Sequence, residues 1–106
     1  MSTTVSGAPR HLSRTSRAWY RDVLADFDLE PHHIRLLQLA AEAWDRGQEA
    51  REVLAESGAV IADRFGVPRA HPAVAIERDS RIAFARLVRE LDLDGEPRPD
   101  PRPRRL

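Results

Sequence analysis

The chain has no cysteine, no lysine, and no hydrophobic run that approaches the roughly 20 residues of a membrane-spanning helix. Disulfides and thiolate metal sites are therefore excluded, and we expect no membrane partner. Only six residues are aromatic and fifteen of the hydrophobic ones are alanine, so 106 residues predict one domain with a thin core. Residues 1–10 lack the apolar segment of a secretion signal, which predicts a cytoplasmic location.

The net formal charge is zero, but the charges are segregated along the chain. Residues 1–21 hold four arginines and no acid, whereas residues 22–57 hold nine acids against three arginines. Residues 58–91 are again basic, with six arginines against four acids. A chain that is neutral on average can therefore present a basic face to a polyanion.

Apolar periodicity predicts three helices. The first follows a flexible arm at residues 1–12 and ends before Glu30 and Pro31, because proline disfavours a helical residue before it. The second runs from Pro31 to about Ser57, where Gly58 is suited to cap it. The third runs from Pro72 to about Leu91.

Between the second and third helices, β-branched residues flank a turn signal at residues 63–66, which predicts a short β-hairpin or an ordered loop. The predicted fold class is all-α: a short N-terminal helix plus a long antiparallel helical hairpin, with the β-hairpin or loop at its tip. Residues 13–94 would form a single helical domain. Residues 95–106 alternate proline with charged residues and are predicted to be a disordered tail.

The apolar faces of the two long helices are broader than one subunit can bury, which predicts a homo-oligomer larger than a dimer. We expect four large side chains in the core or in the oligomer interface: Leu37, Trp44, Leu54 and Leu87. A tryptophan in the middle of a helix is more often core than a ligand platform, and this core can be shared between subunits.

The acid-free basic segment contains the candidate DNA-binding residues Arg10, Arg14, Arg17 and Arg21. The last three are spaced three and four residues apart, so they lie on one helical face that could contact phosphates. The alternative is that they are solvated charges balancing the acidic second helix.

Signals for catalysis, metal binding and cofactors are missing. The sequence has no phosphate-binding GxxxxGK[ST] loop and no GxSxG elbow, and its histidines lack metal-ligand spacing. We therefore predict no catalytic residues, no metal site and no cofactor.

Several short elements in order resemble the terminase small subunits of tailed bacteriophages over about residues 15–94. They are the helix containing Trp19, the segment Leu36-Leu37-x-x-Ala40-Ala41-x-Ala43-x-Asp45-Arg46, Gly58, Phe65-Gly66, His71-Pro72, and Arg86-Leu87-x-x-Glu90-Leu91-x-Leu93. The resemblance implies a non-catalytic, ring-shaped homo-oligomer in the host cytoplasm. Such a subunit binds double-stranded viral DNA at the packaging start site and presents it to the large ATPase and nuclease subunit.

One departure from that family bears on how DNA is contacted. Many small terminases carry a compact helix-turn-helix, whereas the helix after Pro31 is far longer than a usual recognition helix. Two other functions stay open: a helical adaptor or scaffold that binds only protein, and a small transcriptional regulator.

Overall fold

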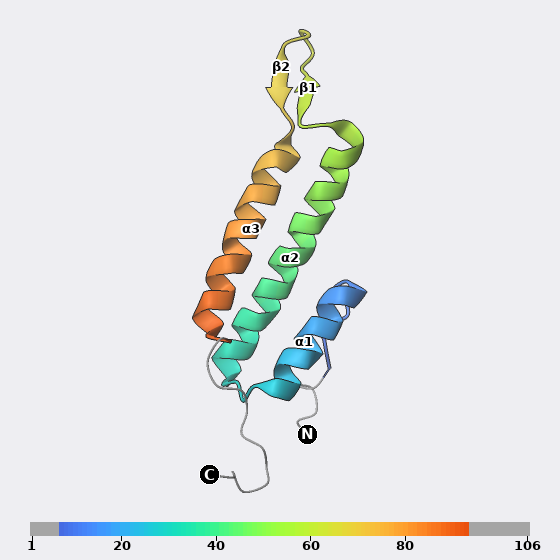
Figure 1. Cartoon of the computed structure of the whole chain (residues 1–106). Helices are drawn as coiled ribbons and strands as arrows, with labels where there is room; N and C mark the ends of the chain where they lie inside the picture. The colour runs from blue at the N-terminus through green and yellow to red at the C-terminus, as the bar shows by residue number, and fades with distance from the viewer. Residues whose placement is uncertain (1–6, 94–106) are drawn as a thin grey trace, which may run out of the picture.

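The computed structural model describes residues 7–93, which form three helices and a two-stranded sheet (Figure 1). The elements in chain order are α1 (Arg14–Asp26), α2 (Pro31–Ser57), β1 (Val60–Ala62), β2 (Pro68–Ala70) and α3 (Pro72–Leu91). The helix boundaries predicted from the sequence are confirmed, and so is the hairpin between α2 and α3. The structure is mostly helical, as predicted.

The predicted start and stop signals act through local hydrogen bonds. The Ser13 hydroxyl caps α1 by accepting the N–H of Ser16 at 3.1 Å. Gly58 ends α2 with φ 81°, a positive φ that glycine adopts at little cost because it has no Cβ. His71 caps α3, because its Nδ1 accepts the backbone N–H of Ala73 at 3.0 Å. These caps fix where each helix begins or ends.

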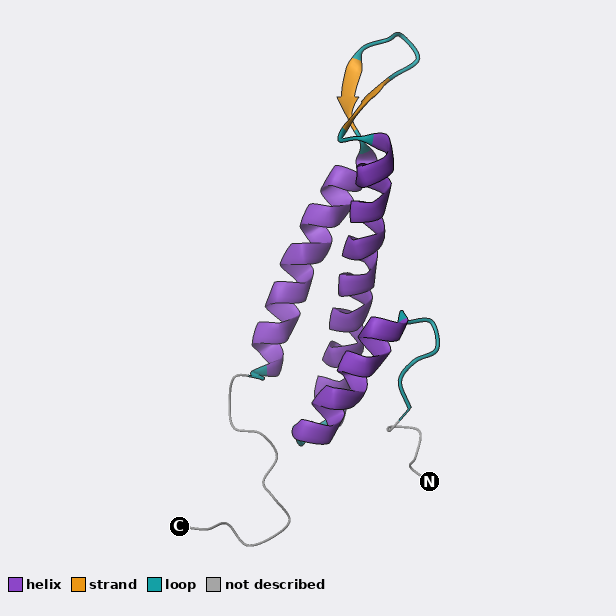
Figure 2. Cartoon of the chain, turned by 45° about the vertical axis from the view of Figure 1, so that its right-hand side comes forward, coloured by secondary structure: helices purple, strands orange, loops and turns teal. Residues whose placement is uncertain are grey.

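Helices α2 and α3 pack along most of their length, and both views show them as an elongated hairpin (Figure 2). Small residues make this close packing possible: Ala40, Ala43 and Ala50 of α2 are buried. At Gly47, an added Cβ would lie 3.4 Å from the Cβ of Ser80 on α3. The small residues of α2 therefore lie on the face that packs against α3.

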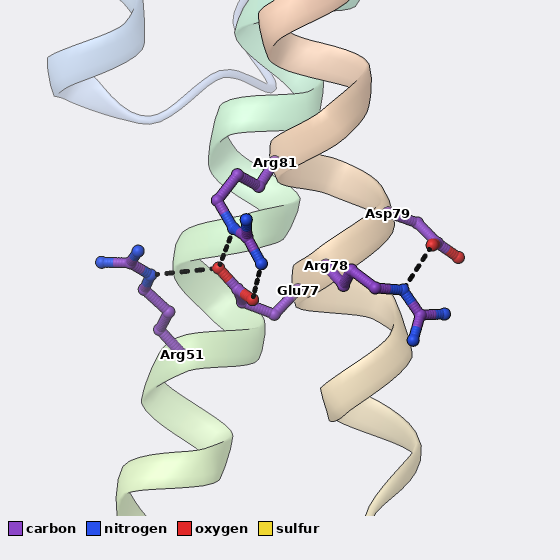
Figure 3. Close-up of polar contacts among 5 residues, drawn as sticks. All are labelled: Arg51, Glu77, Arg78, Asp79 and Arg81. Carbon is purple, nitrogen blue, oxygen red and sulfur yellow. Dashed lines mark hydrogen bonds and ion pairs between the residues drawn. The ribbon is translucent and has the colours of Figure 1, made fainter.

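Two ion pairs share one carboxylate, and one of them also joins the two long helices (Figure 3). Glu77 of α3 accepts hydrogen bonds from Arg81 at 3.3 and 3.5 Å and from Arg51 of α2 at 3.4 Å. The hydrogen bond from Arg81 is the main cause that lowers the pKa of Glu77. Both arginines are largely exposed, so the contribution of this network to stability is small.

The hydrophobic core lies at the end of the molecule away from the β-hairpin, where α1 packs against the first half of α2 (Figure 1). Its buried members are Leu12, Tyr20, Val23, Leu37, Ala41 and Leu91. Three helices and the segment before α1 contribute to this cluster. The rest of the hairpin extends beyond it without cover from α1.

Residues 7–12 differ from the predicted flexible arm. Leu12 is only 3% exposed and belongs to the core, and Ala8 packs against the same cluster. The apolar Leu12 anchors this segment, a contact that residue composition alone did not indicate. Residues 1–6 of the predicted arm and the predicted tail at 95–106 lie outside the described residues.

Strands β1 and β2 pair antiparallel, with Val60 opposite Ala70 and Ala62 opposite Pro68. All six strand residues are exposed, and the β-hairpin projects beyond the ends of the two long helices (Figure 2). None of the helices described is both long and apolar enough to cross a membrane.

Candidate nucleic-acid interface

Helix α1 presents three of the four predicted DNA-binding arginines, Arg14, Arg17 and Arg21, and Arg10 lies just before the helix. Arg17 is half-buried and its Nη1 donates to the backbone oxygen of Arg10 at 3.3 Å, whereas the other three are exposed. None of the ion pairs within residues 7–93 includes any of these four arginines. Their positive charge is therefore available to an external anion.

A hydrogen-bonded clasp between α1 and α2 holds this basic face in place. Asp45 of α2 accepts the backbone N–H and the hydroxyl of Ser13, each at 2.7 Å, and the hydroxyl of Ser16 at 2.6 Å. Ser16 is buried, so the clasp is partly shielded from water. We call Ser13, Ser16 and Asp45 the α1 clasp.

A second contact lies beside the clasp. His11 Nε2 donates to Glu42 Oε2 at 2.7 Å, and Gln38 donates to the same oxygen at 3.0 Å. The hydrogen bond from Gln38 is the main cause that lowers the pKa of Glu42; burial raises it, and His11 lowers it further. Glu42 therefore stays ionised at neutral pH, and it ties the segment before α1 to α2.

Asp45 is also favoured in its charged form. Burial is the largest single influence and would raise its pKa, but the hydrogen bonds from Ser16 and Ser13 together outweigh it and hold the pKa below its ordinary value. The proximity of His11 acts in the same direction. The clasp is thus built around a carboxylate and depends on its ionisation.

An acidic cavity of about 760 Å³ opens beside the N-terminal end of α1. Its carboxylates come from α2: Glu42, Asp45, Glu49 and Glu52. His11 and Arg46 also line it, so the cavity has mixed charge with acids in excess. An anion such as a phosphate would be repelled from this side of α2.

An aromatic groove adjoins the acidic cavity and shares Thr15 and Trp44 with it. Phe84 of α3 lies between two tryptophans, with ring centroids 5.7 Å from Trp19 of α1 and 5.1 Å from Trp44 of α2. The groove encloses about 240 Å³ and is almost wholly apolar. Trp44 is 42% exposed, so its ring is only partly covered within the single chain.

The turn of the β-hairpin carries a second set of exposed functional groups. Asp63 Oδ1 accepts the backbone N–H groups of Phe65 at 2.8 Å and Val67 at 2.9 Å, and Gly66 adopts φ 79°. These hydrogen bonds hold the turn in one shape. Phe65 is 76% exposed, and the Arg64 guanidinium lies 5.0 Å from its ring centroid.

The other three residues expected in the core or interface lie apart from this groove or deeper in the molecule. Leu37 is fully buried in the core, whereas Leu54 and Leu87 are half-buried on the two long helices. Within residues 7–93, no group of three His, Asp or Glu side chains is placed to hold a metal ion.

We did not predict the α1 clasp from the sequence, although one pattern in the sequence indicates it. Asp45 continues the Leu37 and Ala41 stripe at a spacing of four, so it is an acid in line with core positions. Serines at the first turn of α1 supply the donors that such an acid needs.

Comparison with known proteins identifies a family. A protein-family model described as phage terminase, small subunit, matches residues 18–101 of the 106. No match was found among the curated proteins or among the solved structures. The matched range begins within α1 and includes α2, the β-hairpin and α3.

Proposed function

The chain belongs to the small-subunit family of phage terminases, which supports a role in phage DNA packaging, and from this we propose a more specific function. The subunit binds double-stranded viral DNA at the packaging start site and presents it to the large terminase subunit. It performs no catalysis itself and acts as a ring-shaped homo-oligomer in the host cytoplasm.

The basic face of α1 is the observation that carries this proposal. Arg10, Arg14, Arg17 and Arg21 have no acidic partner within the described residues, and the α1 clasp docks the helix that carries the last three of them. Arginines on a docked helix lose only side-chain conformational entropy when they bind phosphates, because the backbone is already ordered. We assign the phosphate contacts to this face.

The exposed apolar side chains of the hairpin support the homo-oligomer. They lie on both long helices and on the β-hairpin: Leu39, Trp44, Val53, Val60, Ile61, Phe65, Val67, Ile76 and Ile82. Surface of this kind is typical of protein interfaces. An oligomer would repeat the basic face once per subunit, so weak contacts to phosphates would add up along one DNA molecule.

Binding to labelled DNA tests the proposal. A duplex that spans the packaging start region and a scrambled duplex of equal length are titrated with the protein at fixed salt, and fluorescence anisotropy is recorded. The start-site duplex should bind more tightly, and adding the large subunit should produce a ternary complex on it. A protein that associates with the large subunit without DNA and binds neither duplex would be an adaptor, contrary to the proposal.

A further inference from the structure

The β-hairpin turn and the aromatic groove have matching chemistry. The turn presents an exposed aromatic ring, Phe65, with the Arg64 cation beside it. The groove offers an apolar cavity bordered by Trp19, Trp44 and Phe84, with the acidic cavity beside it. An aromatic side chain and an arginine thus stand next to each other on one surface, and an aromatic pocket and carboxylates stand next to each other on the other.

We infer that the turn of one subunit docks in the aromatic groove of a neighbouring subunit, so that Phe65 contacts Trp44 and Arg64 faces the acidic cavity. This inference rests on the homo-oligomer of the proposed function and not on its DNA binding. The occupant of the groove is a second copy of this chain.

The dimensions of the groove fit this occupant. Its volume of about 240 Å³ exceeds the roughly 150 Å³ that suffices for a benzene ring in a protein cavity. The lining is apolar, and tilted ring contacts already connect Phe84 to both tryptophans, so another ring would extend the cluster.

The charges of the two surfaces are complementary. Arg64 takes part in none of the ion pairs between described residues, and Arg69 is paired only with Asp63 of the same turn. Glu49 and Glu52 of the acidic cavity likewise have no ion pair there, so both can face an incoming arginine. Complementary charge of this kind orients a partner and speeds its encounter.

The contact must be between subunits. About 20 Å of helix separate Trp44 from the end of α2 at Ser57, and the β-hairpin continues beyond that end (Figure 1). Phe65 therefore cannot reach the groove of its own chain. A turn-to-groove contact joins two different surfaces, and such heterologous contacts close into rings when the rotation per subunit permits.

Site-specific cross-linking tests the contact directly, because a chain without cysteine allows single thiols to be introduced cleanly. Arg64→Cys and Thr15→Cys proteins are prepared separately, mixed, and treated with a short bismaleimide. The mixture should give a cross-linked dimer that neither protein gives alone. Arg35→Cys in place of Thr15→Cys is the matched control, since Arg35 is also exposed but does not line the groove.

Self-association of point variants gives an independent measurement. Phe65→Ala should raise the dissociation constant for self-association by about tenfold or more, as expected for an aromatic anchor. The turn should stay folded because Asp63 holds it through backbone N–H groups. Val60→Ala, at an exposed apolar residue of the same hairpin, should change the constant by less than about threefold, since most interface residues contribute little.

The outcomes separate this inference from the proposed function. An oligomer that gives no cross-link between positions 64 and 15, and that tolerates Phe65→Ala, would overturn the docking mode while leaving the proposed function intact. A Phe65→Ala variant that assembles normally but binds DNA less well would assign the turn to DNA and would also overturn it. A parent protein that stays monomeric would overturn both the docking mode and the proposed oligomer.

Discussion

The carboxylate of Asp45 accepts both the backbone N–H and the hydroxyl of Ser13 at 2.7 Å, so one acidic residue of α2 holds the start of α1. The Ser16 hydroxyl adds a third hydrogen bond at 2.6 Å. The helix with the predicted DNA-binding arginines is therefore joined to the hairpin by polar contacts at its first turn. Apolar contacts from Tyr20 and Val23 hold the rest of it.

Removal of the clasp should loosen α1. Asp45→Ala leaves the two serines without their acceptor, and we expect the free energy of unfolding to fall by about 2–3 kcal/mol, since hydrogen bonds to a charged group contribute more than neutral ones. Urea denaturation followed by tryptophan fluorescence measures this. Glu52→Ala is the control at an exposed acid of the same helix with no hydrogen bond of its own described, and a decrease as large as that of Asp45→Ala would contradict the role of the clasp.

Stability should fall in acid through the same residue. The pKa of Asp45 is held below its ordinary value in the folded chain, so its stabilisation is complete above that ordinary value, 3.8, and disappears as the pH falls through the folded pKa. The pKa of Glu42 is likewise held below its ordinary value of 4.5, so its contribution to stability is also lost as the pH falls below that value. The free energy of unfolding of the parent should exceed that of Asp45→Asn at pH 7. The difference between the two free energies should narrow as the pH falls below about 4. A gap that stays constant down to about pH 2.5 would mean that Asp45 ionisation contributes nothing.

DNA binding should depend on the four arginines of the basic face. Replacing Arg10, Arg14, Arg17 and Arg21 by alanine should weaken binding to all duplexes and flatten the dependence of log affinity on log salt, by roughly 0.9 for each phosphate that is no longer neutralised. A salt titration of fluorescent duplex measures both effects, and light scattering checks that the oligomer is intact. The matched control replaces four exposed arginines outside the basic face, Arg35, Arg78, Arg86 and Arg89, with the same change in net charge. If both variants bind DNA equally weakly, net charge rather than the basic face governs binding.

Substitution of Trp44 should affect both the stability of the single chain and its self-association, and the two effects can be measured separately. Its side chain is 42% exposed and contacts Phe84, so Trp44→Ala should cost about 1–2 kcal/mol in the dissociated chain, less than the roughly 3–5 kcal/mol of a fully buried ring. Self-association should weaken at the same time. Chemical denaturation at low and high protein concentration distinguishes the two effects, because only the assembled protein becomes more stable with concentration. A destabilisation of about 3 kcal/mol or more at low concentration would place the ring in the core of one chain.

Much of this fold could be predicted from the sequence because its boundaries depend on local chemistry. Pro31 and Pro72 stand at the first positions of their helices, and Gly58 is the positive-φ cap that ends α2. The small residues on α2 determine the face that packs against α3. Each of these features acts within a few residues, or through a periodicity that can be read directly.

Long-range packing could not be predicted in the same way. Leu12 lies in a segment of polar and small residues, and only the folded chain brings it against α2. On α3 the bulky apolar Ile76 is 44% exposed, whereas the small residues Ala73 and Ser80 are buried. Close packing favoured the small side chains over the bulky one there. The candidate arginines could be identified from their charge pattern, but the clasp that orients them joins residues 29 and 32 positions apart.

The unbroken α2 helix makes the length of the hairpin a fixed dimension of the subunit. One residue inserted between Trp44 and Ser57 would turn the β-hairpin by about 100° relative to α1 and move it by about 1.5 Å. Because α3 packs along α2, such an insertion would also need a counterpart in α3. Related sequences should therefore tolerate substitutions at exposed positions. Insertions or deletions in α2 between α1 and the β-hairpin should occur together with matching ones in α3, and each should span close to a whole number of helical turns.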